Sequence, residues 1–352
     1  MEKEKLELND LADAILPWYY THQRELPWRQ DRDAYHIWVS EIMLQQTRVE
    51  AVKGYYNRFM EALPTVADLA NASDARLSKL WEGLGYYSRV RNLHKAAQVI
   101  MEKHQGVFPK EYEEIIALPG IGPYTAGAVC SIAFNQKTPA VDGNVLRLWS
   151  RLTNDFRVVD QPAFRKDATA ALKAIYPQNA GDFTQALMEL GATVCGPDKA
   201  PDCGRCPCAS FCKAHQLGTA QELPVRLPKK QRRIEYKTVF VLHAKDLYAI
   251  SKRPAKGLLA GMWQFPNTDG FLSPTEAVDY LQKQNIRVEN ITKEVERTHI
   301  FTHIQWNMRC YYLDVGGVLP NLHWRTLEQI RSEEALPTAF RIFLPDEKQA
   351  PA

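Results

Sequence analysis

The stretch that decides the fold is Leu118–Arg147, which reads LPGIGPYTAGAVCSIAFNQKTPAVDGNVLR. Its opening, LPGIG, predicts a hairpin between two helices, with Pro123 at the first position of the second helix, where a missing N–H is tolerated. Gly120 and Gly122 are expected to allow left-handed backbone angles and a close approach of the backbone to a ligand. Backbone amides beside a helix N-terminus favour a bound phosphate, so the hairpin is a candidate phosphate site.

The second half of the stretch predicts another apolar helix, introduced by the residues VDGN at 141–144. Asp142 stands at the position of a helix cap, where backbone N–H groups and the helix dipole should keep its carboxylate ionised. A plain N-cap is the simpler interpretation of Asp142 taken alone. A phosphate site and a fixed negative charge so close together fit a polyanionic ligand whose reacting centre becomes cationic. The apolar positions of the helix are Val145, Leu146, Leu148, Trp149 and Leu152.

The composition bounds the class of protein. A chain of 352 residues is long enough for two domains with separate cores, and 45% apolar with 24% charged residues is ordinary for a globular protein. A net charge of +3 permits nucleic acid as a partner without demanding it. No run of residues resembles a membrane span or a signal peptide. We therefore expect a cytoplasmic protein with reduced thiols and no membrane partner.

Hydrophobic spacing divides the chain into a helical part and a mixed part. Residues 6–215 predict successive helices, among them 38–49, 68–82, 89–103 and 162–176. The segment QELPVRLPKKQRRIEYK at 221–237 has two prolines and six basic residues against two acidic ones. It predicts an exposed linker, either a plain tether or a segment lying along a phosphate backbone.

The pattern changes after about residue 234. Short strands are predicted at 238–242 and 247–250, with a turn at 244–246 between them. A helix is predicted at 274–284 and another strand at 308–315. The C-terminal part is therefore expected to be an α+β domain.

Glu41 is the first candidate acid. On a helix it lies beside Ile37, Trp38, Leu44 and Gln45, and these surroundings remove solvent from its carboxyl group. Its pKa should rise, so it is expected to hold a proton near neutral pH. The alternative is a glutamate that reaches solvent or pairs with an arginine. Together, a protonated Glu41 and an ionised Asp142 match the acid and the charge stabiliser of a cleavage through an oxocarbenium-like state.

Five of the seven cysteines lie between 195 and 212. Zinc ribbons usually show two Cys-x-x-Cys pairs, whereas this run has one such pair with an outer cysteine on either side. The spacing favours a [4Fe–4S] cluster over zinc, and a disulfide is not expected in the cytoplasm. Cys208 is an alternative ligand inside the loop, while Cys130 and Cys310 are interpreted as core residues. The proposed ligands are Cys195, Cys203, Cys206 and Cys212.

Two segments carry side chains suited to opening a duplex. Gln46 and Thr47 follow the Glu41 helix, and the glycine-flanked turn at 82–87 presents Leu84 and Tyr86. An apolar wedge and a side-chain amide fill the space left by an extruded base. The alternative is that the tyrosines of the turn pack against the following helix.

These motifs, in this order, resemble the helix-hairpin-helix DNA glycosylases that carry an iron–sulfur cluster, the endonuclease III superfamily. The resemblance rests on LPGIGPYTAG, VDGNVLR and the four-cysteine loop. Over nearly its whole length the chain is similar to the adenine DNA glycosylases, the MutY family. The supporting strings are LPWR at 26–29, SEIMLQQTRV at 40–49, WEGLGYYSRVRNLH at 81–94 and GLLAGMWQFP at 257–266.

The resemblance implies a mainly α fold. Residues 1–218 would form an all-helical glycosylase domain of two helical subdomains, one of them holding a [4Fe–4S] loop at 195–212. Residues 219–234 would be a basic linker, and 235–345 an α+β Nudix-like domain for lesion recognition. The family more often has six residues after the first cysteine, where this chain has seven.

The resemblance also implies a reaction. The lyase-type relatives have a lysine after the hairpin that forms a Schiff base with the sugar, and here that place is held by Tyr124. The chain would thus be a monofunctional glycosylase. Glu41 would protonate the extruded adenine at N7, Asp142 would stabilise the oxocarbenium sugar, and Tyr124 and Asn144 would help to position it. Water would complete the hydrolysis.

The resemblance further implies the substrate. The C-terminal domain lacks the acidic helix by which Nudix hydrolases hold magnesium, since its helix region reads SPTEAVDYLQKQ. The family recognises 8-oxoguanine opposite adenine with a Phe-Ser-His loop, and this chain has Phe301-Thr302-His303. The expected partner is double-stranded DNA with A:8-oxoguanine or A:G mispairs, bound by a nucleoid-associated monomer. The residues expected to contact DNA or the lesion are Arg24, Arg29, Gln46, Thr47, Leu84, Tyr86, Gly120, Gly122, Phe301, Thr302 and His303.

Two other functions stay open at this point. One is a glycosylase with lyase activity for oxidised pyrimidines, which Tyr124 disfavours. The other is a protein without catalysis, in which the cluster and the hairpin serve lesion binding or redox sensing; the acidic residues at 41 and 142 disfavour it.

Overall fold

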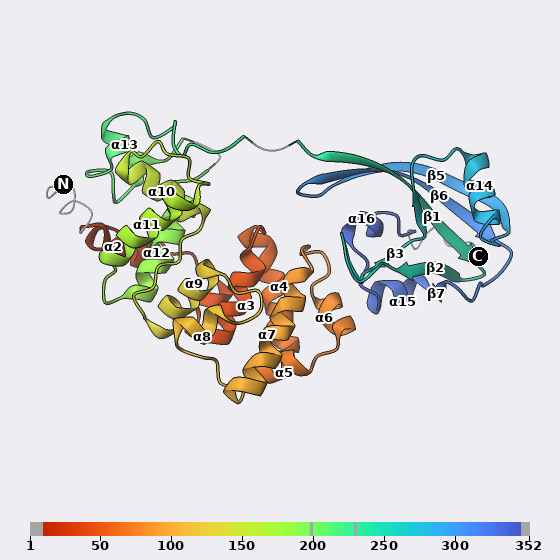
Figure 1. Ribbon diagram of the computed structural model, residues 1–352, viewed down its shortest axis with the longest axis horizontal. Coiled ribbons are helices and arrows are strands. Elements are labelled where there is room, and N and C mark those ends of the chain that lie inside the picture. Colours follow the sequence, from red (N-terminus) through yellow and green to blue (C-terminus); the bar gives the residue numbers. More distant parts are fainter. Residues whose placement is uncertain (1–9, 198–199, 229–230, 346–352) are drawn as a thin grey trace. The chain divides into compact units, whose positions relative to one another are not determined.

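The computed structural model describes residues 10–197, 200–228 and 231–345 (Figure 1). Its contacts divide the chain into two units. The first contains the described residues up to Ala72 and Arg91–Pro228, and the second contains Ser73–Val90 and the described part of Lys229–Ala352. The predicted domain limits at 218 and 235 remain a prediction.

Helices joined by short turns build the first unit, as the helical spacing of the sequence requires. The predictions at 89–103 and 162–176 correspond to single helices. Among the described residues, the unit has α2 (Leu11–His22), η1 (Pro27–Arg29), α3 (Ala34–Leu44), α4 (Val49–Ala62), α5 (Val66–Asn71), α8 (Tyr112–Ile116), α9 (Pro123–Phe134), α10 (Gly143–Thr153), α11 (Pro162–Ala174), α12 (Ala180–Thr193), η2 (Cys203–Arg205) and α13 (Lys213–Gln216), while α7 (Ser88–His104) enters it from the second unit.

The hairpin between α8 and α9 has the predicted form in all but one respect. Gly120 has a φ of +78°, and a Cβ there would lie 2.5 Å from the Cβ of Asn92, so only glycine fits without a shift. Gly122 has a φ of −103°, which corrects the expectation of a left-handed angle at this residue. Pro123 occupies the first turn of α9, as predicted.

The apolar face of α10 lies in a core that it shares with α2, α11, α12 and the cysteine loop. The predicted apolar residues of α10, from Val145 to Leu152, are all buried. Since this core also contains Cys195, Cys208 and Cys212, the loop that carries the cysteines is packed directly against α10.

Two predicted helices are interrupted. The helix expected at 38–49 ends at Leu44, because Gln46 adopts a left-handed φ of +58° before α4 begins. The helix expected at 68–82 is two helices, α5 and α6 (Asp74–Leu80). Ser73 separates them, since its side chain accepts a hydrogen bond from Arg76 N and caps a new N-terminus.

In the described part of the second unit, the strands form a seven-stranded mixed sheet with the order β3-β2-β1-β6-β5, and β4 and β7 pair with β1 and β2 (Figure 1). β1 and β6 are parallel over 233–243 and 304–314, while β5 and β6 are antiparallel. The elements are β1 (Arg233–Ala244), β2 (Leu247–Lys252), β3 (Trp263–Gln264), β4 (Asn267–Asp269), α14 (Pro274–Gln282), β5 (Val288–Ile300), β6 (Ile304–Val315), β7 (His323–Arg325), α15 (Leu327–Ser332) and α16 (Thr338–Arg341).

Helices cover both faces of this sheet. Val239 and Val241 of β1 belong to one cluster with residues of α15 and α16. Phe240 and Leu242, which point to the opposite face, belong to a second cluster with residues of α14. Alternate residues of one strand therefore fill two separate cores, and the strand reads as a continuous apolar run in the sequence.

The sequence did not predict β5. This strand lies at the edge of the sheet and reads VENITKEVERTHI, with most of its side chains exposed. An edge strand with charged residues on both faces lacks the apolar alternation that marks a half-buried strand. Its antiparallel pairing with β6, which extends along the strand, keeps β5 in the sheet.

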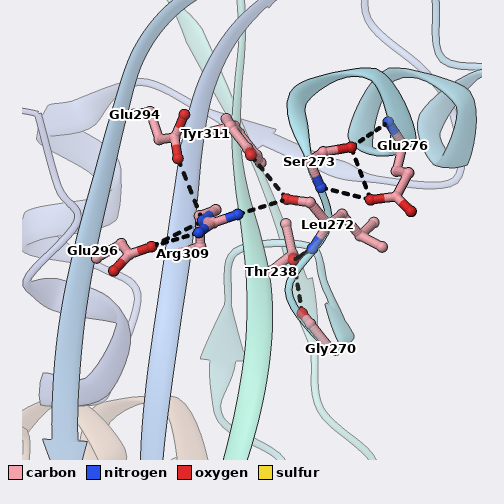
Figure 2. A network of polar contacts seen from close by, with 9 residues as sticks. All are labelled: Thr238, Gly270, Leu272, Ser273, Glu276, Glu294, Glu296, Arg309 and Tyr311. Atoms are coloured by element: carbon pink, nitrogen blue, oxygen red, sulfur yellow. Dashed lines mark hydrogen bonds and ion pairs between the residues drawn. The ribbon is translucent and has the colours of Figure 1, made fainter.

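The loop before α14 is fixed to the sheet by a polar network centred on Leu272 (Figure 2). Its N–H donates to the hydroxyl of Thr238 at 2.9 Å, and its carbonyl accepts from the Tyr311 hydroxyl at 2.8 Å. Arg309 of β6 also donates to this carbonyl, and it pairs with Glu296 of β5 at 2.8 Å. The network joins β1, β6, β5 and the loop.

The predicted linker at 219–234 is only partly exposed. Ala220 and Leu223 are buried in the core of the helical unit, and the carbonyl of Val225 accepts a hydrogen bond from Val159 N at 3.0 Å. Its first residues thus pack on the helices, which corrects the expectation of an exposed segment. In the described ranges, no helix is long and apolar enough to cross a membrane.

Candidate active site and cysteine cluster

A pocket of about 1090 Å³ opens in the helical unit, between the end of α3, the start of α9, the start of α10 and one side of α12. It contains most of the predicted site residues of this unit, although they are spread over more than a hundred positions of sequence. Gly120 does not line the pocket, whereas Gly122 does. The predicted residues that line it are Arg24, Arg29, Glu41, Gln46, Thr47, Gly122, Tyr124, Asp142 and Asn144.

Glu41 is buried on α3, with 5% of its surface exposed. Burial raises the pKa of its carboxyl group to about 7, and the negative charge of Asp142 acts in the same direction. A hydrogen bond from the Tyr124 hydroxyl to Glu41 Oε2, 2.7 Å long, opposes the shift. The prediction that Glu41 has a raised pKa is therefore confirmed.

Tyr124 comes from the first turn of α9, directly after the hairpin. Burial and the neighbouring carboxylates Glu41 and Asp142 raise the pKa of its hydroxyl well above the usual value. Tyr124 thus stays protonated and acts as a hydrogen-bond donor to Glu41.

Asp142 caps α10. One of its carboxylate oxygens accepts from the backbone N–H groups of Asn144 and Val145 at 2.9 and 2.8 Å, and the other accepts from the Asn144 side chain at 2.7 Å. Burial raises the pKa of Asp142, and these hydrogen bonds lower it without cancelling the effect of burial. The cap is as predicted, and its hydrogen bonds favour the ionised carboxylate against the effect of burial.

Asn144 links Asp142 to the cysteine loop. Its side-chain oxygen accepts from Arg147 Nη2 at 2.9 Å, and Arg147 Nε donates to the carbonyl of Cys195 at 2.8 Å. Hydrogen bonds through Asn144 and Arg147 therefore couple the orientation of Asp142 to the conformation of the cysteine loop.

Glu189 is a buried carboxylate of the pocket that was not predicted from the sequence. It is fully buried on α12 and pairs with Arg24 at 2.5 Å and Arg29 at 2.7 Å. Burial alone would raise its pKa, but the two arginines outweigh burial and lower the pKa below the usual value. Arg24 and Arg29, predicted as DNA contacts, thus neutralise Glu189. The sequence signal for Glu189 is its position as an isolated glutamate in the apolar segment ALMELGATVC.

The four predicted cluster ligands, Cys195, Cys203, Cys206 and Cys212, line one small pocket between α10 and the cysteine loop. Cys208 is buried but does not line it. Within the described ranges, no three His, Cys, Asp or Glu side chains are placed to hold a single metal ion. Four thiols around one small space are the donor set that a [4Fe–4S] cluster requires. Two of the seven residues that follow Cys195 lie outside the described residues.

The remaining predicted residues lie in the second unit. Leu84 is buried, while Tyr86 is 45% exposed and has a left-handed φ of +49°. The hydroxyl groups of Tyr86 and Thr302 share a hydrogen bond, so the turn at 82–87 and the loop at 301–303 meet inside this unit. Phe301 packs edge-on against Trp306 with ring centroids 4.9 Å apart, and Thr302 and His303 are exposed.

Glu276 of α14 caps its own helix. Its carboxylate accepts from the backbone N–H and the hydroxyl of Ser273, both at 2.8 Å, and closes the N-terminus of α14 (Figure 2). A carboxylate engaged in a capping box serves the helix.

Two known protein families match separate parts of the chain. Residues 39–164 match the HhH-GPD superfamily of base excision DNA repair proteins, and residues 238–345 match the NUDIX domain. A solved thermostable thymine-DNA glycosylase shares 27% identity, with 61% of this chain and 98% of that one covered and a TM-score of 0.54. A trapped endonuclease III–DNA covalent intermediate, at 23% identity and a TM-score of 0.52, shares the fold.

The adenine DNA glycosylase of Rattus norvegicus is 34% identical, covering 95% of this chain and 79% of the relative. That of Homo sapiens is 32% identical over 97% and 75%, and that of Buchnera aphidicola is 33% identical over 83% and 84%. The chain belongs to the adenine DNA glycosylase family. It is a DNA glycosylase of base excision repair that removes adenine, and DNA is its substrate.

Proposed function

We propose that the protein acts as a monomer on duplex DNA, and that it hydrolyses the N-glycosidic bond of adenine paired with 8-oxoguanine or guanine without cutting the strand. The observation that carries the proposal is the hydrogen-bonded Glu41–Tyr124 pair, which faces a capped Asp142 in one pocket. The Glu41 pKa near 7 leaves a useful fraction of this acid protonated at neutral pH.

Glu41 is the general acid in this proposal. An extruded adenine in the pocket would accept the proton of Glu41 at N7, which turns the base into a better leaving group. Tyr124 donates to one oxygen of Glu41, so the other oxygen is left to carry the proton toward the base. General acid catalysis of this kind contributes about 100- to 10,000-fold to a rate.

Asp142 stabilises the positive charge that develops on the sugar as the bond to adenine breaks. Its three hydrogen bonds fix the carboxylate in place before the reaction, so little reorganisation is needed when the charge appears. Water then adds to the anomeric carbon, and the products are free adenine and an intact strand with an abasic sugar.

We propose that the protein has no lyase activity, because of the residue that follows the hairpin. A lyase needs an amine that forms a Schiff base with the sugar, and Tyr124 has none. The lysine among the described pocket-lining residues is Lys173 of α11, which is exposed. Sodium borohydride present during the reaction should trap no covalent protein–DNA adduct; trapping that is lost in Lys173→Gln would instead assign a lyase to this residue.

We propose a [4Fe–4S] cluster held by Cys195, Cys203, Cys206 and Cys212. The cluster would bind the four thiolates and tie the loop to α10, and no step of the hydrolysis passes through it. Purified protein should contain about four iron atoms per chain. Cys206→Ser should lower the iron content, whereas Cys208→Ser, a matched control at a cysteine outside the pocket, should keep it. Equal iron loss in both variants would contradict the ligand assignment.

The second unit is proposed to recognise the base opposite adenine. Thr302 and His303 are exposed at the tip between β5 and β6, and the hydrogen bond between Thr302 and Tyr86 joins this tip to the turn proposed as a wedge. Together with Phe301, these residues of the second unit would contact the base opposite adenine. The lack of the acidic magnesium-binding helix, where the sequence reads SPTEAVDYLQKQ, supports recognition over hydrolysis in this domain.

The test is strand cleavage before and after hot alkali. A duplex with one A:8-oxoguanine pair should be cut in the adenine strand only after alkali, which breaks the backbone at an abasic sugar. Cleavage without alkali would overturn the monofunctional proposal, and no cleavage at all would overturn the proposed substrate.

A further inference from the structure

A second pocket of the helical unit is not used by the proposed reaction. It has a volume of about 420 Å³ and lies between α10, the cysteine loop and the segment Gln221–Arg226. Three arginines line it, Arg147, Arg151 and Arg226, together with Gln221 and apolar residues. In the described part of the chain, no acidic residue lines this pocket.

Two of the arginines are buried, and each has one guanidinium nitrogen without a hydrogen-bond partner among the described residues. Arg147 and Arg151 are 3% and 4% exposed, and they lie four residues apart on one face of α10. Arg147 donates from Nε and Nη2, and Arg151 donates from Nε and Nη1, to oxygens of the unit and to Cys195 Sγ. Within the described ranges, Arg147 Nη1 and Arg151 Nη2 have no hydrogen-bond partner.

The third arginine closes the pocket from the side of the linker. Arg226 is about half exposed and pairs with Asp160 at 3.3 Å, outside the pocket lining. Its Nη2 lies 3.6 Å from the position that a Cβ of Gly143 would take, so it stands beside the first turn of α10, next to Asp142. Three like charges around one space repel one another, and buried cations require a partner.

We propose that this pocket binds a phosphate group. Guanidinium N–H groups match the oxygens of phosphate in geometry and charge, and several arginines around one space are typical of phosphate sites. The volume accommodates a group several times larger than a water molecule, whose share of the liquid is about 30 Å³. The phosphate comes either from a DNA backbone that continues past the start of α10 or from a free phosphate or nucleotide.

Two binding measurements on the intact, cluster-containing protein test the proposal. In the first, calorimetry measures the affinity for inorganic phosphate at constant ionic strength. In the second, the affinity for a duplex with a non-cleavable adenosine analogue is measured over a series of chloride concentrations. Arg226→Gln is compared with Arg157→Gln, a matched control: Arg157 is also about half exposed and paired with an aspartate, but it does not line the pocket.

A backbone phosphate in the pocket predicts that Arg226→Gln weakens duplex binding about tenfold and reduces the slope of log affinity against log salt by about 1, with Arg157→Gln unchanged. A free phosphate predicts instead that Arg226→Gln weakens inorganic phosphate binding about tenfold while the duplex affinity and slope stay as they were. The inference is overturned if inorganic phosphate does not bind and both variants bind duplex equally, since the arginines would then only offset the charge of the cysteine cluster. Neither measurement depends on adenine excision, so this failure leaves the proposed function standing.

Discussion

Glu41 and Glu189 are two buried glutamates of one pocket whose neighbours shift their pKa values in opposite directions. Glu41 has a neutral hydroxyl as its hydrogen-bond donor and a pKa near 7, while Glu189 has two arginines and a lowered pKa. The sequence predicts the first case because apolar residues surround Glu41 on its own helix. It does not predict the second, because Arg24 lies 165 positions away from Glu189.

Replacing Glu41 by Gln should stabilise the fold at high pH. The folded-state pKa of about 7 lies above the ordinary 4.5, so the stability that Glu41 contributes is complete below about pH 4.5 and is lost as the pH rises to about 7. Glutamine still accepts the Tyr124 hydrogen bond but never ionises. Urea unfolding should show Glu41→Gln more stable than wild type by about 3 kcal/mol at pH 8 and nearly equal at pH 4.5. A difference that does not grow with pH would contradict the shifted pKa.

At the scale of elements, the hairpin before α9 follows from its glycines and Pro123, and the sequence predicted its place correctly. The two glycines nevertheless have different roles. Gly120 is required by its left-handed angle and by Asn92, whereas Gly122 has an ordinary angle and open space where a Cβ would lie. The sequence could not distinguish them, because the constraint on Gly120 comes from the side chain of Asn92 on α7.

This difference predicts that two alanine variants lose different amounts of folding stability. Gly120→Ala should lower the free energy of unfolding by about 2 kcal/mol or more, from the strained angle and the contact with Asn92. Gly122→Ala should change it by less than about 0.5 kcal/mol, but it should weaken duplex binding if the hairpin backbone approaches a phosphate. Equal destabilisation in thermal or urea unfolding would show that the hairpin does not have this geometry.

The interrupted helices belong to the same scale. Apolar spacing continues through Ala72 and Ser73 and beyond Leu44, so the pattern alone predicts longer helices than the structure has. The Ser73 cap and the left-handed Gln46 end them, and both are local backbone features that hydrophobic periodicity does not record.

At the scale of the whole molecule, the sequence separates a helical part from an α+β part but places the segment Ser73–Val90 in the helical part. In the structure this segment shares contacts with the C-terminal residues, for example Lys79 Nζ with the Glu334 carbonyl at 3.1 Å and Glu82 Oε1 with Leu336 N at 2.9 Å. Such long-range contacts between partly buried side chains and distant backbone groups leave no periodic signal in the sequence. Because Ser73–Val90 belongs to the second unit, Tyr86 and Thr302 lie in the same unit.

Thr302 gives a prediction about the choice of the opposite base. If its hydroxyl contacts 8-oxoguanine, then Thr302→Val, which keeps the shape but removes the hydroxyl, should reduce the preference for A:8-oxoguanine over A:G about tenfold. Thr302→Ser keeps the hydroxyl and should retain the preference. Single-turnover rates on the two duplexes measure it, and an unchanged preference in Thr302→Val would place recognition elsewhere.

The central claim is that Glu41 donates a proton while Asp142 stabilises the sugar, and the pH dependence of single-turnover adenine excision tests it most directly. With wild type on an A:8-oxoguanine duplex, the rate should be constant below about pH 7 and fall about tenfold per pH unit above it, as the Glu41 carboxyl loses its proton. Glu41→Gln should be slower by about 100-fold or more and lose this descending limb, and Asp142→Asn should lose at least about 100-fold at every pH. Full activity in both variants, or a descending limb that persists in Glu41→Gln, would contradict the account.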